Sequence, residues 1–177
     1  MTWKGVLVGF ALGIIAVCLA VYAYFAFGFV PVAASAAPLP FEQSLVEKAL
    51  NAQMKAIPAQ QPPFQPSERI YMDAATEYRE HCALCHGLPG ESEPQLAKNM
   101  FPNPPQLFSG KGVTDDPPYR IRWVIQHGIR LSGMAAFDGI LSDNEIWEIS
   151  ELLANADDLP PQVESRLRAP QETSARK

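Results

Sequence analysis

The chain has few cysteines, few histidines and almost no charge in its first part. With three cysteines and three histidines in 177 residues, it offers no set of cysteine pairs typical of a disulfide-stabilised scaffold. Lys4 is the only charged residue before Glu42, so the rest of the chain carries 13 of the 14 basic residues against all 19 acidic ones. This acidic balance argues against nucleic acid as a partner and favours proteins with a basic docking surface.

A long apolar segment begins the chain. Residues 5–30 are about 26 apolar residues, enough to cross the hydrocarbon core of a membrane with some tilt. A cleaved signal peptide is the alternative, because residues 34–36 (Ala-Ser-Ala) resemble a cleavage site, but the segment is about twice as long as a signal core. We expect a retained single-pass anchor at residues 1–34, with its N-terminus inside because Lys4 lies on the short N-terminal flank.

A linker is expected at residues 35–66. Three prolines within residues 31–40 should end the spanning helix there. Residues 41–57 place apolar and charged side chains on opposite faces and predict an amphipathic helix. Residues 58–66 are rich in proline and predict a semi-rigid spacer before the next domain.

Two of the three cysteines form a motif with a histidine. Residues 82–86 read Cys-x-x-Cys-His, the attachment pattern of c-type haem. On a helical turn this spacing places both thiols on one side, where they can add to the two haem vinyl groups, and His86 can bind the iron. A thioredoxin-like motif would need a βαβ context, and a zinc site would need a second ligand pair. We therefore expect one haem c held covalently by Cys82 and Cys85, with His86 as an iron ligand.

The residues around this motif resemble a known family. Ala74, Tyr78 and Cys82 are spaced four residues apart, and Gly87 follows the histidine. In this pattern the chain resembles the class I cytochromes c of the bacterial single-haem type, although Ala74 stands where the family usually has glycine. The resemblance covers residues 73–155. It implies an all-α class I cytochrome c fold around one covalent haem, preceded here by the transmembrane helix and the proline-rich linker.

The haem domain is expected at residues 67–156, followed by a mobile polar tail at 157–177. Its predicted helices cover residues 73–86 with Asp73 as N-cap, 117–126 with Asp115 or Asp116 as N-cap, and about 143–155 after a capping box formed by Ser142 and Glu145. A short helical turn is possible within residues 93–100. The resemblance further implies that a backbone carbonyl in residues 101–107, that of Pro104 or Pro105, accepts the imidazole N–H of the iron-binding histidine.

Residues 128–137 resemble the distal loop of this family, in which Gly-Met-Pro-x-Phe carries the second iron ligand. Here the loop reads Gly-Met-Ala-Ala-Phe at residues 133–137, with Ala135 in place of proline. The resemblance implies Met134 as the second ligand. Four alternatives remain for this position: Met100, Met72, His127 and His81. A second histidine would give the iron a lower potential than methionine does. Arg120, Arg122 and Trp123 are candidates to reach the haem propionates.

An iron with one histidine and one methionine ligand has no open position and transfers one electron. The resemblance therefore implies an electron-transfer protein rather than an enzyme, anchored in the bacterial inner membrane with its haem domain in the periplasm. It would be either a free shuttle or the cytochrome subunit of a respiratory or photosynthetic complex or of a membrane dehydrogenase. The alternatives are a haem enzyme, such as a peroxidase or nitrite-reducing module, and a gas or redox sensor in which the distal methionine is displaced.

Overall fold

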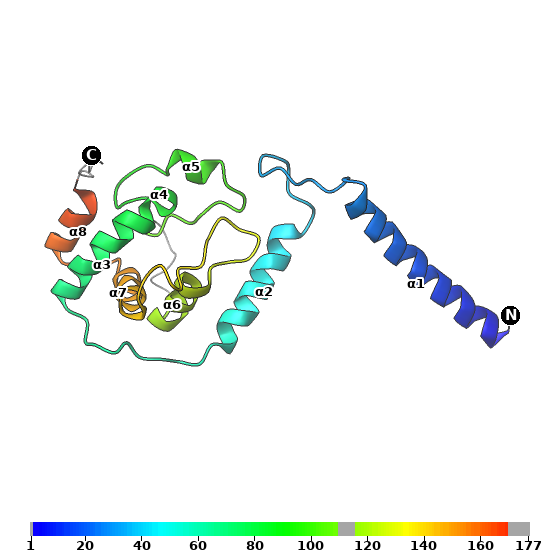
Figure 1. Cartoon of the computed structure of the whole chain (residues 1–177), viewed down its shortest axis with the longest axis horizontal. Helices are drawn as coiled ribbons and strands as arrows, with labels where there is room; N and C mark the ends of the chain where they lie inside the picture. The colour runs from blue at the N-terminus through cyan, green and yellow to red at the C-terminus, as the bar shows by residue number, and fades with distance from the viewer. Residues whose placement is uncertain (1, 110–115, 170–177) are drawn as a thin grey trace. The chain divides into compact units, whose positions relative to one another are not determined.

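The computed structural model describes residues 2–109 and 116–169. Every regular element in these two ranges is a helix, so the all-α prediction is confirmed (Figure 1). The chain divides into two compact units, Met1–Glu42 and Gln43–Lys177. The first unit contains α1, and α2 begins at the boundary between the two units.

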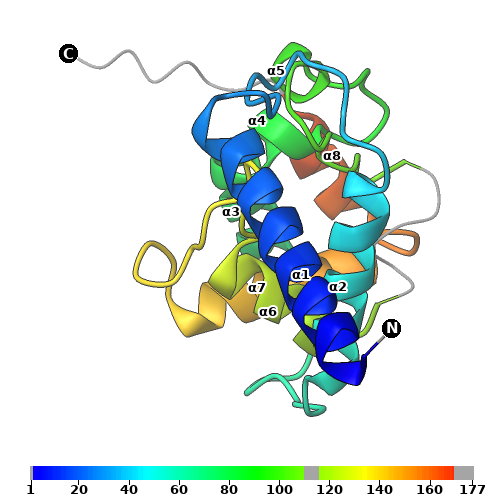
Figure 2. The ribbon, with the colours of Figure 1, turned by 90° about the vertical axis from the view of Figure 1, so that its right-hand side faces the viewer.

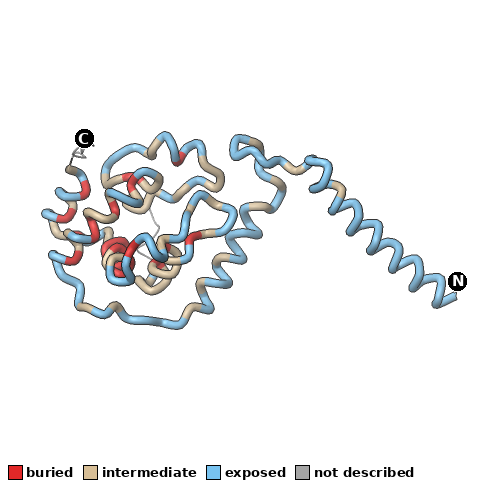
Figure 3. Tube along the Cα trace, viewed as in Figure 1, coloured by how far each residue is buried: buried red, intermediate tan, exposed pale blue. Residues whose placement is uncertain are grey.

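Helix α1 extends from Trp3 to Ala26 over 24 residues. At 1.5 Å per residue it is about 36 Å long, which exceeds the roughly 30 Å of a hydrocarbon core. None of its residues is buried, and Figure 3 shows it exposed along its length. By length and composition α1 is a candidate membrane span, although a signal sequence meets the same criteria. It ends before the prolines that we expected to stop it, because Gly28 takes a φ of 73°.

Helix α2, Glu42–Ala56, agrees with the amphipathic helix predicted at residues 41–57. At its start the Glu42 carboxylate accepts the backbone N–H of Leu39 at 2.8 Å. Leu50 and Met54 lie one turn apart on this helix and are half-buried. The proline-rich residues 58–66 that follow form no helix, as expected of a spacer.

The core of the second unit forms around α7 (Asp143–Ala154), which packs against both α3 (Glu68–His81) and α6 (Pro118–His127). Figures 1 and 2 both show α6 beside α7. Helix α7 supplies the largest share of the buried apolar side chains: Ile146, Trp147, Ile149, Leu152 and Leu153. Ala74 and Ala75 of α3 are fully buried, and their small side chains leave room for the helices that pack on α3.

The prediction of a mobile tail at residues 157–177 is wrong for its first part. Residues Pro161–Arg168 form helix α8, which packs on α3, while residues 170–177 lie outside the described residues. Pro161 fits the first helical turn because its missing N–H would have no partner there. Val163 and Leu167 follow four residues apart and are fully buried in the same core as α7. The haem domain therefore continues beyond residue 156.

The first helix of the haem domain also begins earlier than predicted. Helix α3 starts at Glu68, because the Ser67 hydroxyl caps it by accepting the N–H of Ile70 at 3.5 Å. Asp73, the expected cap, lies inside the helix and forms an ion pair with Arg69 at 2.9 Å. Starting at Glu68 adds one more turn, and this turn buries Ile70.

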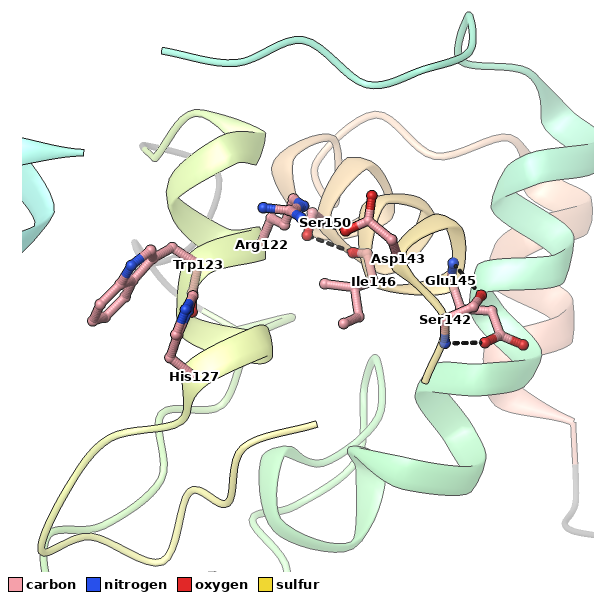
Figure 4. A network of polar contacts seen from close by, with 8 residues as sticks. All are labelled: Arg122, Trp123, His127, Ser142, Asp143, Glu145, Ile146 and Ser150. Atoms are coloured by element: carbon pink, nitrogen blue, oxygen red, sulfur yellow. Dashed lines mark hydrogen bonds and ion pairs between the residues drawn. The ribbon is translucent and has the colours of Figure 1, made fainter. Parts of the chain in front are cut away.

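The predictions of the N-terminal caps of α6 and α7 have different outcomes. Helix α6 starts at Pro118 after Pro117, and Asp116, a predicted cap, forms an ion pair with Arg120 at 3.5 Å instead. Asp115, the other predicted cap, lies outside the described residues. The capping box predicted for α7 is confirmed, with Ser142 and Glu145 each bonding the backbone of the other (Figure 4).

Candidate functional site

The Cys-x-x-Cys-His motif lies where two helices meet. Cys82 ends α3 and precedes the four-residue helix α4, Ala83–His86. Its N–H donates to the Tyr78 carbonyl at 2.8 Å, and its own carbonyl accepts the N–H of His86 at 2.9 Å. The single helix predicted at residues 73–86 is thus interrupted at Cys82. Tyr78 and Cys82 still share the inner side, since Tyr78 is fully buried and Cys82 packs against the core.

The two thiols of the motif are free and half-buried. Burial, with smaller contributions from the charges of Cys85 and Glu77, raises the pKa of the Cys82 thiol to about 12. Thioredoxin-like motifs depend on the opposite shift, because the thiolate is the attacking species. The environment of Cys82 therefore disfavours thiol–disulfide exchange, one of the alternatives for this motif.

The imidazole of His86 is held by one hydrogen bond from a remote segment. Its Nδ1 lies 2.8 Å from the carbonyl oxygen of Pro105, and because a carbonyl only accepts, Nδ1 carries the proton. This tautomer leaves Nε2 available to a metal ion. Burial lowers the pKa of His86, although the bond to Pro105 opposes the shift, and the neutral ring is the form that binds metals. Of the two prolines proposed for this role, the structure selects Pro105.

Gln106 fixes the segment that carries Pro105, and sequence reasoning missed this residue. Its side-chain amide donates to the carbonyls of Cys85 and Pro104, both at 3.3 Å. Gly87 has a φ of 70°, and a Cβ at this position would lie 2.3 Å from the Gln106 side-chain oxygen. The carbonyl of Gly87 in turn accepts the hydroxyl proton of Tyr78 at 2.9 Å. Glycine is therefore favoured after His86 by its backbone conformation, and a side chain there would displace the Gln106 amide.

Residues 128–137 form a loop closed by its own hydrogen bonds. The N–H of Ile129 donates to the Met134 carbonyl at 3.1 Å, and the Met134 N–H donates to the Ser132 hydroxyl at 3.0 Å. Gly128 has a φ of 64°, and a Cβ there would lie 2.6 Å from the Met134 carbonyl oxygen. The backbone of Met134 is thus fixed on both sides, and its side chain is half-buried.

The alternatives to Met134 lie in different environments. His127 is exposed, stacks on Trp123 with ring centroids 4.8 Å apart, and directs Nδ1 to the Trp123 carbonyl (Figure 4). The Nε2 atom of His81 lies 3.5 Å from a carboxylate oxygen of Glu77. Met72 packs against the helical core. Met100, by contrast, lies against the loop itself, because its methyl carbon is 1.9 Å from the position of a Cβ on Gly133.

The two arginines of α6 already have acidic partners. Arg122 pairs with Asp143 of α7 (Figure 4). Its guanidinium also lies 5.1 Å from the centre of the Trp147 ring. Arg120 pairs with Asp116. In both arginines Nε is buried without a hydrogen-bond partner, so each retains one donor for an acceptor such as a carboxylate. Their role toward haem propionates stays a prediction.

The donor set of this site fits a covalently attached haem. Two free thiols lie at the attachment spacing, an oriented neutral imidazole follows them, and a thioether lies in a closed loop. Residues 69–153, a little under half of the chain, match the family model described as cytochrome c oxidase, cbb3-type, subunit III. This range begins in α3, ends in α7 and includes all four predicted site residues. No curated protein matches the chain.

Proposed function

Residues 69–153 form a c-type cytochrome domain, and from this premise we propose that the protein is a membrane-anchored cytochrome c that carries single electrons. The observation that carries the proposal is the pair of ligand environments, His86 held by Pro105 and Met134 held in its closed loop. When bound, haem supplies an iron that alternates between the ferric and ferrous states by one electron. Cys82 and Cys85 would attach it, and His86 and Met134 would bind its iron.

A single haem is proposed because the sequence contains one Cys-x-x-Cys-His motif. The remaining cysteine, Cys18, lies within α1 and has no histidine or second cysteine near it in the sequence. The chain's own residues then have positioning tasks. Pro105 and Gln106 orient the imidazole of His86, and the hydrogen bonds of Ile129 and Ser132 present the side chain of Met134.

An enzymatic role receives less support from the same loop. Acid–base catalysis on a bound substrate needs a titratable group within hydrogen-bond reach of the reacting atoms. Among residues 128–137, Arg130 is the single ionisable side chain, and it is exposed. A guanidinium stays protonated at all ordinary pH values and cannot serve as a general base. The loop is therefore suited to hold a ligand rather than to carry out proton transfer.

We propose that the domain works in the periplasm, attached to the bacterial inner membrane by α1. Support comes from the length and apolar character of α1 and from Lys4 on its N-terminal side.

Four acidic side chains line one groove between α3 and α7: Asp73, Glu77, Glu145 and Glu148. They support a redox partner with a basic docking surface. The matched family is named for an oxidase subunit, which favours a place in a respiratory complex, while a free shuttle is the other candidate.

The test is a redox titration of the full chain matured with haem, combined with exposure of the ferrous protein to carbon monoxide. A carrier shows one haem per chain, a one-electron transition and no rapid carbon monoxide complex, because both axial positions are filled. Rapid formation of that complex would reject the carrier and favour an enzyme or a sensor. A titration that needs two independent one-electron steps would reject the single haem.

A further inference from the structure

Met100 connects the two sides of the candidate haem site. It lies just after helix α5, Gln95–Lys98, where its N–H donates to the Ala97 carbonyl at 3.0 Å. A few residues later, Pro105 accepts the proton of His86. The side chain of Met100 reaches the opposite loop, where its methyl carbon occupies the space in front of Gly133, the residue before Met134. One short segment thus contacts the surroundings of both predicted iron ligands.

We propose that Met100 is a positioning residue that sets the place of the Met134 loop. The proposal rests on the proposed ligation of the iron by Met134. The hydrogen bonds described for residues 128–137 fix the two ends of the loop to α6, through the carbonyls of Val124 and Ile125, and Phe137 packs on the core. The part of the loop around Gly133 lies between these ends, and the contact of Met100 with Gly133 adds a constraint there from a segment far earlier in the chain.

The two residue types at the contact between Met100 and Gly133 fit a positioning role for Met100. A glycine at position 133 lets the Met100 methyl group approach the backbone, and the Met100 sulfur lies 3.6 Å from the position that a Cβ would take. Methionine fills irregular gaps well because its side chain is long, unbranched and polarisable. Leu131, two residues before Gly133, is 91% exposed, so this part of the loop has little packing of its own if Met100 is removed. Met100 contributes the contact at residue 133.

The experiment compares variants of the full-length, haem-loaded protein by two spectroscopic readouts. The first is the near-infrared band of ferric iron bound to methionine sulfur, and the second is the rate of carbon monoxide binding to the ferrous protein. Met100→Ala should weaken the band and raise the rate about tenfold, the factor that corresponds to a ligand bond weakened by 1.4 kcal/mol. Met100→Leu keeps the apolar volume but lacks sulfur, and it should retain the band.

A suppressor variant makes the test specific for the contact. Gly133→Ala places a Cβ 1.9 Å from the Met100 methyl carbon and should also raise the carbon monoxide rate. In the double variant Met100→Ala, Gly133→Ala the new methyl group fills part of the vacated space, so the rate should return to within about twofold of the wild type. If the rate increase of the double variant equals the product of the two single increases, Met100 and Gly133 do not act through one contact.

Three further outcomes decide the proposal. Met72→Ala removes a half-buried methionine that packs on the helical core, and it should lower stability without changing either readout. An equal effect of Met72→Ala and Met100→Ala would overturn a positioning role, because any core truncation would then suffice. Loss of the band in Met100→Leu with its retention in Met134→Leu would make Met100 the ligand itself. If the near-infrared band is retained in both Met134→Leu and Met100→Leu, the ligation of the iron by Met134 in the proposed function is rejected.

Discussion

The two proposed iron-binding sides of the domain are held by contacts of different range. On the histidine side, Pro105 and Gln106 bond to His86 and Cys85 from about twenty residues further along the chain. On the methionine side, the described hydrogen bonds of the loop begin and end near the loop, and its tip at Leu131 is 91% exposed. The histidine side is thus tied to a segment distant in the chain, whereas the hydrogen bonds of the methionine side reach no further than the neighbouring helix α6.

This difference assigns separate tasks to the two sides. Segments with few buried contacts and exposed backbone open at lower free energy than segments built into a core. The histidine would therefore stay on the iron, while exchange of the axial ligand, if it occurs, would start at the methionine loop. A carrier needs that loop closed, and a sensor needs it to open. The same fold serves either role, depending on how firmly the loop is held.

The largest expected effect comes from breaking the histidine side at its covalent bond. Cys85→Ala removes one of the two thiols, so attachment by two thioethers is abolished and haem is held by one thioether or lost. Covalent haem is measured by haem staining after denaturing electrophoresis and by the pyridine haemochrome spectrum. Cys18→Ala is the matched control and should give normal attachment, because Cys18 lies in α1. Normal attachment in Cys85→Ala would contradict the assignment of the motif.

The second-largest effect is expected from replacing the proposed methionine ligand. Met134→Ala removes the proposed thioether ligand and should lower the reduction potential by on the order of a hundred millivolts or more, because methionine stabilises ferrous iron. The ferrous variant should also bind carbon monoxide rapidly, while haem attachment remains complete. Redox titration and flow kinetics measure these effects. An unchanged potential would move the ligand assignment to Met100 or His127.

A matched pair of variants sharpens the comparison between the two sides. Ser132→Ala removes a hydroxyl that accepts the Met134 N–H at 3.0 Å and donates to the Ile129 carbonyl at 2.8 Å. The two lost hydrogen bonds cost about 1 kcal/mol each, so carbon monoxide binding should accelerate by up to about thirtyfold. Gln106→Ala removes two bonds of 3.3 Å from a segment that the core also supports, and it should leave this rate within about twofold. A larger effect of Gln106→Ala would reverse the ranking of the two sides.

Features that depend on a few neighbouring residues could be predicted from the sequence. The haem attachment motif occupies five adjacent residues, and the capping box needs only Ser142 and Glu145. Pro105 was one of two candidates because the family resemblance placed the loop to within a few residues. These features depend on local spacing, which a single sequence displays directly.

Features that depend on packing were missed for a physical reason. Residues 157–169 are polar on average, and this composition hid the two core positions Val163 and Leu167 of α8. The hydrogen bonds that hold α8 also join residues far apart in the sequence, since Arg79 of α3 donates to the carbonyls of Arg166 and Leu167. The contact of Met100 with Gly133 is of the same kind. No spacing rule predicts such pairs, because each partner is ordinary in its own stretch of sequence.

The smallest expected effect lies at the start of α7, outside both ligand loops. Ser142→Ala removes half of the capping box of α7 and should lower the free energy of unfolding by about 1 kcal/mol at neutral pH, without changing the spectra or the carbon monoxide rate. The bonds to Ser142 lower the pKa of Glu145 below its ordinary value of 4.5, so its carboxylate stabilises the fold above that pH and less as the pH falls below it. The difference between variant and wild type should therefore shrink in acid, as measured by denaturant unfolding. A difference that stays constant across this range, or a spectral change in Ser142→Ala, would show that α7 is coupled to the ligand loops more strongly than its contacts indicate.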